Sequence, residues 1–444
     1  MSEAIETRRQ PSSIRRVATA SLVGTSIEWY DFFLYGTAAS LVFNKLFFPT
    51  LSPLAGLLAS FATFWVGFGA RPVGGIFFGH FGDRIGRKNM LIMTILLMGV
   101  GTFLIGCLPT YSSIGIFAPI LLVILRFTQG FAVGGEWGGA VLMATEHSPA
   151  NRRGFFGSWP QMGVPIGLLL SSLLFSLVST SFSSDQFLAF GWRIPFLVSV
   201  VLVFIGLFIR LRITETPDFE RVKERRTIVR VPILQVLRKD LKNVLLAGGI
   251  FFIANGGFYI FITFIVSYGT TVLKMSKDIF LNGTLVSAVV LFITLPVAGF
   301  LSDRYGRRTL CLIGSGLTIL LAYPIFLLID SKSVALIWLA LCLAQFTTGL
   351  IYGPLAAYFT ELFGANVRYS GASLGYQAAA VFAGGLAPTI AVLLLGVDHN
   401  ASWPIAIYVA LMALITFVSS YLAPETRPTA VAESSSVVGS VSGD

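Results

Sequence analysis

The sequence predicts an all-α polytopic membrane protein in which twelve transmembrane helices form two pseudo-symmetric six-helix bundles. Three observations support this fold class: a strongly apolar composition, many long apolar runs, and one motif that occurs once in each half of the chain. The 444 residues are 55% hydrophobic and 12% charged, and the mean hydropathy is +0.81. Soluble domains carry about 25% charged residues, so the composition excludes an ordinary soluble enzyme.

The apolar runs repeatedly reach the roughly 20 residues that a helix needs to cross a bilayer. They are continuously apolar and lack the ten-residue alternating segments of outer-membrane barrels, so we expect helices rather than strands. The twelve predicted spans are residues 17–43, 53–78, 89–108, 116–145, 155–180, 192–211, 241–272, 279–300, 309–329, 334–360, 369–395 and 402–422.

The repeated motif follows the second apolar run of each half. Gly79–Lys88 reads GHFGDRIGRK and Gly299–Arg308 reads GFLSDRYGRR, so both copies fit G-x-x-x-D-R-x-G-R-[KR] at a separation of 220 residues. Further pairs recur at similar separations: Glu146 with Glu361, Arg153 with Arg368, and Thr214–Pro217 with Pro424–Arg427. Internal repeats of this kind are typical of secondary transporters.

A polar stretch at residues 212–240 separates six spans from six, and we interpret it as a linker or surface helix on the cytoplasmic face. The predicted organisation is a cytoplasmic N-terminal segment, an N-terminal six-helix bundle, this linker, a C-terminal six-helix bundle and a cytoplasmic tail. Their boundaries are residues 1–16, 17–211, 212–240, 241–422 and 423–444.

The net charge of +10 follows the membrane topology. With both termini cytoplasmic, 24 of the 31 Lys and Arg residues fall in cytoplasmic segments and five fall outside. This asymmetry satisfies the positive-inside rule and indicates a bacterial-type inner membrane protein with both termini in the cytoplasm. We therefore attribute the basic charge to orientation and expect no nucleic-acid partner.

Several motifs resemble those of one family. The repeated motif resembles the loop signature of the major facilitator superfamily, and Arg126–Glu136 resembles the motif in its fourth span. Within the superfamily, further segments are similar to the metabolite:proton symporter family: Glu28–Phe32, Arg71–Gly75, Gly135–Gly139 and Gly191–Phe196. The N-terminal half is most similar to shikimate permeases, whereas the C-terminal half is less distinctive.

This resemblance implies two six-helix bundles around a central cavity, alternating access and proton-coupled uptake. Members of the family carry shikimate, 2-oxoglutarate, citrate, dicarboxylates, proline or betaine. It also implies that the repeated motif is a latch between the bundles on the cytoplasmic side.

Five charged residues lie in the interiors of predicted spans, away from the span ends and all in the first half: Glu28, Asp31, Arg71, Arg126 and Glu136. A charge at the bilayer centre costs at least about 2.5–3.5 kcal/mol on insertion scales, and such residues default to function. We interpret the carboxylates as candidates for proton coupling and the arginines as candidates for binding a substrate carboxylate. The alternative for each is a permanent structural ion pair, and that alternative stays open here.

Weaker candidates for substrate contact are polar residues within the spans, which also form ordinary interhelical hydrogen bonds. They are Tyr30, Tyr35, Gln129 and Gln161 in the first half, and Asn255, Tyr259, Gln345, Tyr352, Tyr376 and Gln377 in the second.

The candidate cytoplasmic gate combines the charges of the two motif copies with the acidic and basic pairs that recur beside them. The residues are Asp83, Arg84, Arg87, Glu146 and Arg153 in the first half, and Asp303, Arg304, Arg307, Glu361 and Arg368 in the second. We expect Asp83 to cap a neighbouring helix N-terminus and Arg87 to pair with Glu146. The alternative to a gate is that these charges only set the membrane orientation, and that Gly86 and Gly306 only form tight turns.

Other functional classes fit less well. No Ser–His, Cys–His or metal-ligand spacing appears, so we expect neither an enzyme nor a metal or cofactor. A secondary transporter of a small organic acid anion such as shikimate or a di- or tricarboxylate fits best, coupled to protons and functioning as a monomer in the bilayer. A zwitterionic osmolyte as substrate, sodium coupling, and an uncoupled facilitator or exchanger remain alternatives.

Overall fold

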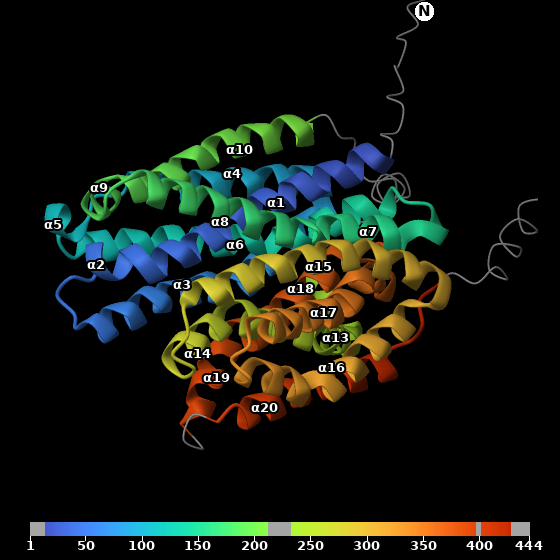
Figure 1. The fold of residues 1–444 in the computed structure, drawn as a ribbon. Helices are drawn as coiled ribbons and strands as arrows, with labels where there is room; N and C mark the ends of the chain where they lie inside the picture. The colour runs from blue at the N-terminus through green and yellow to red at the C-terminus, as the bar shows by residue number, and fades with distance from the viewer. Residues whose placement is uncertain (1–13, 212–231, 397–400, 428–444) are drawn as a thin grey trace, which may run out of the picture.

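The computed structural model describes residues 14–211, 232–396 and 401–427. Within these ranges the chain is helical and contains no strand. The first half, from blue to green in Figure 1, lies against the second half, from yellow to red. Predicted segments 1–16, 212–240 and 423–444 fall largely outside the described residues; of the linker, residues 232–239 are seen as a short helix.

The N-terminal bundle contains the six predicted spans of the first half. Its helices are α1 (Ile14–Ala38), α2 (Asn44–Leu46), α3 (Pro53–Ile85), α4 (Arg87–Cys107), α5 (Tyr111–Ile114), α6 (Phe117–Glu146), α7 (Arg153–Gln161), α8 (Gly163–Ser181), α9 (Ser184–Ala189) and α10 (Ile194–Leu211). The fifth span is divided into α7 and α8, because Pro160 and Pro165 remove backbone donors on both sides of the break at Met162.

The C-terminal bundle repeats this arrangement after the short helix of the linker. Its helices are α12 (Pro232–Lys239), α13 (Leu241–Tyr259), α14 (Ile265–Thr271), α15 (Lys277–Tyr305), α16 (Arg307–Asp330), α17 (Val334–Leu362), α18 (Arg368–Ala379), α19 (Ala387–Leu395) and α20 (Trp403–Leu422). Three spans contain a π-helical turn, at Ala39–Phe43, Ile260–Phe264 and Ala380–Gly385.

Glycine explains the sharp turn inside each motif copy. Gly86 separates α3 from α4 with a φ of 112°, and Gly306 separates α15 from α16 with a φ of 106°. Side chains rarely tolerate this region of φ, so the glycine lets two antiparallel spans be joined by a single residue. The two copies of the motif therefore build the same corner in both halves.

Ten helices within the described residues are long and apolar enough to cross a membrane by length and composition. The remaining two spans begin at α1 and α3, which pack against α8 and α6. Large apolar side chains are exposed on the outer helices, for example Leu173, Phe204 and Leu320 at 69%, 67% and 72%. A lipid environment accounts for this exposure, which water would disfavour.

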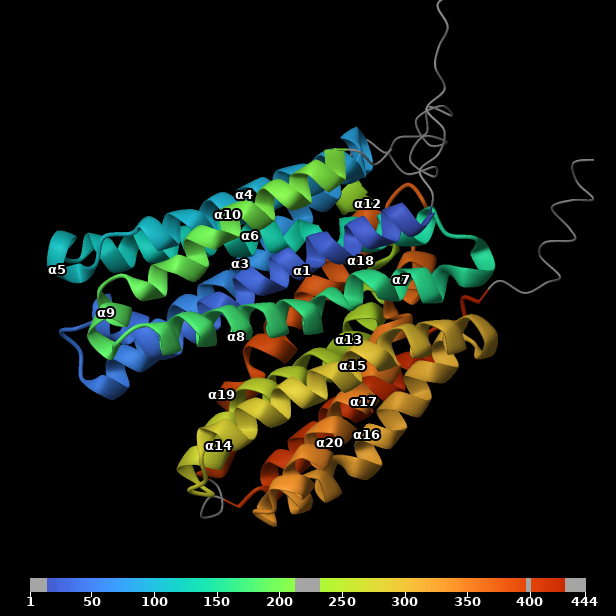
Figure 2. The same ribbon diagram turned by 45° about the horizontal axis from the view of Figure 1, so that its top comes forward.

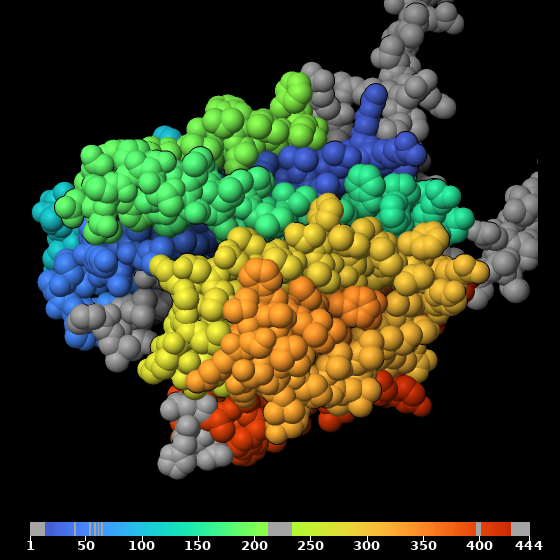
Figure 3. Space-filling model, viewed as in Figure 1, coloured from blue at the N-terminus to red at the C-terminus, as the bar shows by residue number. Residues whose placement is uncertain are grey.

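The bundles meet most closely at one end of the molecule. There α7 packs against α15 and α17, and α18 packs against α3 and α6. Figure 2 shows the halves diverging from that end toward the other, where α5 and α9 lie on one side and α14 and α19 on the other. Figure 3 shows the seam between them, with the green first half against the yellow second half. We call the closed end the latch end.

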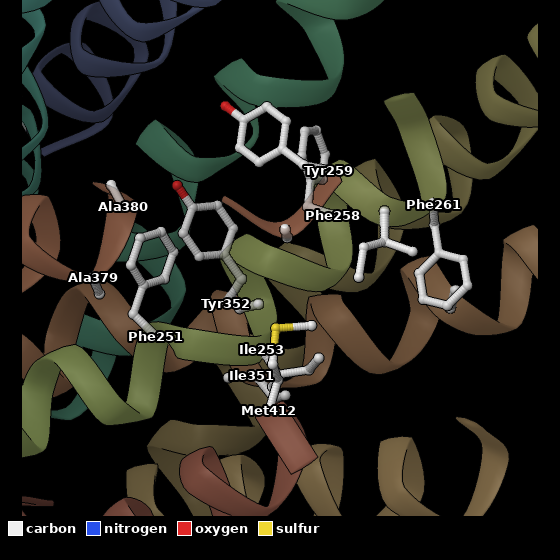
Figure 4. Packing of buried hydrophobic residues seen from close by; sticks show 14 of the residues in the cluster. Phe251, Ile253, Phe258, Tyr259, Phe261, Ile351, Tyr352, Ala379, Ala380 and Met412 are labelled. Carbon is white, nitrogen blue, oxygen red and sulfur yellow. The ribbon is translucent and has the colours of Figure 1, made fainter. Parts of the chain in front are cut away.

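The second half has the larger continuous apolar core, drawn in Figure 4. The phenol rings of Tyr259 and Tyr352 lie at the edge of this core. Their hydroxyls point away from Met412 and Ile351, toward the ribbons of the first half. The interface between the halves is therefore where the polar groups of the second half are directed.

Candidate functional site

Helix α1 places two carboxylates inside the molecule. Glu28 and Asp31 are 6% and 0% exposed, and their spacing puts them on the same side of the helix. Arg71, Arg210 and Glu136 lie within electrostatic range of Glu28. Both carboxylate oxygens of Asp31 are buried without a hydrogen-bond partner, and the Arg126 guanidinium is within electrostatic range of them.

Arg71 lies in an aromatic cage. Its guanidinium carbon is 4.4 Å from the ring centre of Phe68 and 4.6 Å from that of Phe32, and the Trp29 ring is 5.9 Å away. Tyr259 of the second half lies beside the same guanidinium. Within the described residues Arg71 has no carboxylate at ion-pair distance. Cation–π attraction thus holds a buried positive charge that an anion could approach.

Arg126 is connected to the same centre by a different route. Its guanidinium carbon lies 4.1 Å from the ring centre of Tyr35 and 4.8 Å from that of Phe32. Its Nη1 donates to Oε1 of Gln129 at 3.2 Å, and Nε2 of Gln129 donates to the Thr102 hydroxyl at 2.8 Å. Phe32 therefore contacts both arginines, while Gln129 connects Arg126 to the hydroxyl beside Asp31.

Glu136 has a separate environment. Both of its oxygens pair with Arg210, one of them at 3.0 Å from Nη1, and the Thr94 hydroxyl donates to it at 2.5 Å. Nη1 of Arg210 also donates to the carbonyl of Leu91. Arg210 is one of the 24 Lys and Arg residues counted as cytoplasmic, because it ends an apolar run, but it is 4% exposed. Both oxygens of Glu136 are therefore bonded in this structure.

Aromatic rings connect the two halves at the centre. Trp137 on α6 stacks on Tyr376 on α18 at 3.9 Å with an interplanar angle of 13°, and Tyr376 stacks on Phe251 on α13 at 4.0 Å. Gln161 accepts from the Trp137 indole at 2.8 Å and donates to the Tyr352 carbonyl at 3.2 Å. The Tyr352 and Tyr376 hydroxyls are 3.0 Å apart.

The other residues predicted to contact the substrate differ in whether their polar atoms already form hydrogen bonds within the protein. The Tyr30 hydroxyl donates to the Pro195 carbonyl at 2.7 Å, and the Tyr35 hydroxyl is 2.5 Å from that of Thr63. By contrast, Asn255 has a buried amide nitrogen without a hydrogen-bond partner, as does Gln345, whose amide oxygen also lacks one. Unsatisfied buried groups cost about 1–3 kcal/mol, so these two amides are the better candidates for bonding to a ligand.

Gln377 has one polar atom that is hydrogen-bonded and one that is not. Its Nε2 donates to the carbonyls of Val133 and Gly134 at 3.3 and 3.2 Å, which connects α18 to α6. Its Oε1 is buried and has no hydrogen-bond partner. Gln377 therefore joins the halves and keeps one acceptor available.

At the latch end, Asp83 of the first half caps a helix of the second half. It accepts hydrogen bonds from the backbone N–H groups of Tyr369 and Ser370 at 3.2 and 3.0 Å, and from the Ser370 hydroxyl at 2.8 Å. These donors open α18, where the helix dipole favours a carboxylate. Beside it, Glu146 pairs with Arg87 and, across the interface, with Arg368 at 2.9 Å.

Asp303 makes the reciprocal cap. It accepts from the N–H groups of Gly154 and Phe155 at 2.8 and 2.9 Å, at the start of α7, and lies 2.8 Å from Arg307. Arg307 also pairs with Glu361 at 3.3 Å. Each aspartate of the repeated motif therefore binds a helix N-terminus of the opposite half. We call these two sets of contacts the latch.

Three predicted gate residues lie outside the latch contacts. Arg84 donates toward the ring of His80, and Arg304 lies 5.6 Å from the ring of Tyr305. Among the described residues Arg153 makes no ion pair. Conversely, the sequence did not single out Ser370, or Thr426, whose hydroxyl donates to Glu361 at 2.7 Å. The match of Thr214–Pro217 with Pro424–Arg427 marks the segment that holds Thr426.

A family model described as "Major Facilitator Superfamily" matches residues 22–388. The chain belongs to the major facilitator superfamily. It is 42% identical to the shikimate transporter of Escherichia coli strain K12, over 94% of this chain and 96% of the relative. It is 41% identical to the inner membrane metabolite transport protein YhjE of the same strain, over 94% and 95%.

Further similarities agree with this membership. The chain is 36% identical to the proline/betaine transporter of E. coli K12, over 93% of this chain and 84% of the relative. In fold it is similar to a structure of the proton:xylose symporter XylE, with a TM-score of 0.75 and 17% identity over 94% of this chain and 97% of the other. The expected family and twelve-helix fold are thereby confirmed. The protein is a membrane transporter of the metabolite:proton symporter group and not an enzyme.

No group of three or more His, Cys, Asp or Glu residues in the described part of the chain is placed to hold a metal ion.

Proposed function

We propose that the protein is a proton-coupled symporter that takes up a small organic acid anion, such as shikimate or a di- or tricarboxylate, by alternating access. The observation that carries this proposal is the buried centre with two carboxylates, Glu28 and Asp31, and two arginines, Arg71 and Arg126, all at most 6% exposed. The 42% identity to a shikimate transporter supports an organic acid as substrate.

Charge balance explains why such a centre couples an anion to a proton. Glu136 is neutralised by Arg210, so the two remaining carboxylates balance the two remaining arginines. An anionic substrate adds a negative charge to a buried site, which is costly unless it is compensated. Protonation of one carboxylate restores neutrality, because a nearby negative charge favours the protonated form. For a substrate with one negative charge, this balance requires one proton, and the two carboxylates can take up at most two.

The geometry suggests a division of roles in that centre. Asp31 is the first candidate for the coupled proton, with Glu28 beside it. Arg126 and Arg71 bind the substrate carboxylate through their planar guanidinium groups. Asn255, Gln345 and Tyr259 of the second half bond to the neutral part of the substrate, since each has a buried polar atom without a hydrogen-bond partner.

The state of the latch suggests which side is closed. Arg84, Arg87, Arg304 and Arg307 lie at the latch end, whereas Arg193 lies near the α9 end of the first half. By the positive-inside rule, the latch end faces the cytoplasm and both termini are cytoplasmic. We infer that the structure is closed to the cytoplasm, and that the protein functions as a monomer in the bacterial inner membrane.

The second candidate is proton-coupled uptake of a zwitterionic osmolyte, favoured by the 36% identity to a proline/betaine transporter. A zwitterion adds no net charge, so charge balance alone demands no proton for it. A facilitator or exchanger without coupling is the third candidate, in which the buried carboxylates serve only as structural partners of the arginines.

Uptake into proteoliposomes separates the candidates. Shikimate, 2-oxoglutarate, citrate, proline and betaine are offered in labelled form, with and without an inward proton gradient. We expect accumulation of one organic acid only with the gradient. Accumulation of betaine or proline instead would select the second candidate, and equilibration without accumulation would select the third.

The same assay tests the coupling residue. Asp31→Asn removes the proton site and keeps the side-chain shape, so we expect loss of gradient-driven accumulation with retained exchange of preloaded substrate. Tyr30→Phe is the matched control, because it changes a neighbouring residue whose hydroxyl bonds to the Pro195 carbonyl. Normal gradient-driven accumulation in Asp31→Asn would remove Asp31 from the coupling role.

A further inference from the structure

Tyr369 crosses from the second half into the interior of the first. It is fully buried and is the second residue of α18. Its backbone N–H donates to Asp83, as described for the latch, and its hydroxyl donates to the carbonyl of Gly135 on α6 at 2.7 Å. One residue therefore connects the latch to the interior of the opposite bundle.

Glycines form the space that this ring occupies. A Cβ atom on Gly82 would overlap the Tyr369 ring, one on Gly138 would lie 3.0 Å from two ring carbons, and one on Gly139 would lie 2.8 Å from the hydroxyl. Phe78, Met90 and Leu142 complete an apolar cluster with the ring. We call the surface of Gly82, Gly138 and Gly139 the glycine socket, because a side chain at any of the three would meet the Tyr369 ring or its hydroxyl.

The glycine socket is next to a buried ion pair. Gly135 precedes Glu136, and the charged groups within electrostatic range of the Tyr369 hydroxyl are Glu136, Arg210, Asp83 and Arg87. Tyr369 is thus within electrostatic range of both the motif charges at the latch end and the Glu136–Arg210 pair. Glu136 is also within electrostatic range of Glu28, which is in turn within range of Asp31.

The contacts of Tyr369 to the first half exist only while the latch is closed. When Asp83 no longer caps α18, the Tyr369 and Ser370 N–H groups separate from it, and the ring moves with the start of the helix. The glycine socket is then empty and the surface in front of Glu136 is exposed.

We propose that Tyr369 is a removable plug that closes a proton exit at Glu136 whenever the latch is closed. This proposal rests on the proposed proton coupling. Asp31 and Glu28 hold the coupled proton, and Glu136 receives it after the Tyr369 ring leaves the glycine socket. The O–H bond of the Glu28 carboxyl breaks, an O–H bond forms on Glu136, and the proton passes from Glu136 to cytoplasmic water.

The plug is tested first without reference to protons. Thr94 is 1% exposed and bonds to Glu136, so Thr94→Cys reports water access to the pair. In a background without Cys107, Cys311 and Cys342, we measure its labelling by a small membrane-impermeant thiol reagent supplied at the latch end. Tyr369→Ala should raise the labelling rate about tenfold or more, because a protected site becomes open to solvent. Tyr369→Phe keeps the ring and should label almost as slowly as the parent.

Tyr358→Ala is the matched control. Tyr358 is a fully buried tyrosine on α17 of the same half, and its hydroxyl donates to the Pro424 carbonyl at 2.9 Å. Its truncation leaves a comparable cavity at the same end of the molecule and should not change the labelling of Thr94→Cys. Unchanged labelling in Tyr369→Ala, or equal acceleration in Tyr358→Ala, overturns the plug.

The exit is tested second, in proteins that keep Thr94. Proteoliposomes with a pH-sensitive dye inside and no substrate are exposed to a pH gradient. Tyr369→Ala should dissipate the gradient faster than the parent and Tyr369→Phe, and Glu136→Gln added to Tyr369→Ala should remove the leak. Faster labelling without a leak overturns the role of Glu136 as proton exit. Loss of gradient dependence in the parent's uptake refutes the proposed function instead, and the labelling result is independent of it.

Discussion

The two halves of the chain carry the same motif but use it differently. In the first half, Glu146 pairs with Arg87 of its own bundle and with Arg368 of the other. In the second half, the equivalent Glu361 pairs with Arg307 and accepts from Thr426, both of its own half. The two aspartate caps are reciprocal, but among the described residues the Glu146–Arg368 ion pair across the interface has no counterpart at Glu361. A sequence repeat thus preserves the helix caps more strictly than the salt bridges around them.

The halves also differ in buried charge. The first half holds Glu28, Asp31, Arg71 and Arg126 around one centre, whereas the second half contributes amides and phenols such as Gln345 and Tyr259 to the interior. Duplication supplied two similar bundles, and the charged chemistry is concentrated in one. The substitutions below compare equivalent or opposed positions in the two halves.

The largest difference should appear between Glu146→Gln and Glu361→Gln. The first change removes a carboxylate from buried Arg87 and from Arg368 at once. Removing one partner of a buried pair costs about 3–5 kcal/mol, so we expect a clear fall in Tm. Glu361→Gln leaves Arg307 with Asp303 at 2.8 Å, whereas Glu146→Gln leaves Arg87 with Asp83 at 3.9 Å. Glu361→Gln should therefore cost about 1–2 kcal/mol less. Thermal unfolding of both purified variants is the measurement, and equal losses would refute the asymmetry.

Substrate affinity should distinguish the charged half from the neutral one. Arg126→Lys keeps the charge but loses the planar fork, and a hydrogen bond to a charged group contributes about 1.5–3 kcal/mol. Gln345→Leu removes a neutral partner, so it should cost about 1 kcal/mol. Calorimetric titration with the transported substrate compares them. If Arg126→Lys and Arg126→Ala both bind normally, Arg126 is structural.

The two caps should shift the latch in the same direction but to different extents. Asp83 accepts three hydrogen bonds from the opposite half and Asp303 accepts two. Asp83→Asn should therefore populate the latch-open state more than Asp303→Asn, by about 1–3 kcal/mol at most. Distances between spin labels on the latch ends of the two bundles measure this. Unchanged distances in both variants would mean that the motif acts in topology and folding only.

The smallest effect should come from the paired arginines Arg368 and Arg153. The Arg368 side chain is 15% exposed and bonds across the interface, so Arg368→Gln should weaken the latch by about 0.5–1 kcal/mol. Arg153→Gln removes no ion pair and should leave the spin-label distances unchanged. A larger change in the spin-label distances for Arg153→Gln than for Arg368→Gln would contradict the assignment of Arg368 as the arginine that pairs across the interface.

The sequence predicted the fold well because hydropathy and length determine spans directly. The repeated motif and the recurring Glu–Arg pairs then indicated the two bundles. The details that the sequence missed depend on how helices bend and rotate. The break in the fifth span and the π-helical turns leave no clear hydropathy signal, since apolar residues continue through them.

The same limit applies to the site. Depth along a helix can be read from residue number, so the sequence placed Asp31 and Arg126 near mid-membrane, and both are buried. Residue number does not show which residue of another helix a side chain will contact. Arg210 looked like a loop charge because it ends an apolar run, and its pairing with Glu136 depends on the packing of α10 against α4. Tyr369 gave no signal, because its glycine socket comes from residues far away in sequence.

The three stacked rings of Trp137, Tyr376 and Phe251 have a consequence for kinetics. Stacked rings attract one another by dispersion and have no strict directional requirement, so two bundles that rotate about this contact change its energy gradually. The caps of the latch are directional hydrogen bonds and are lost within a small displacement. The hydrogen bonds of Gln161 and Gln377 also cross the interface, but at 3.2–3.3 Å they are longer than most of the cap bonds. The larger part of the activation barrier for opening should therefore arise at the latch end.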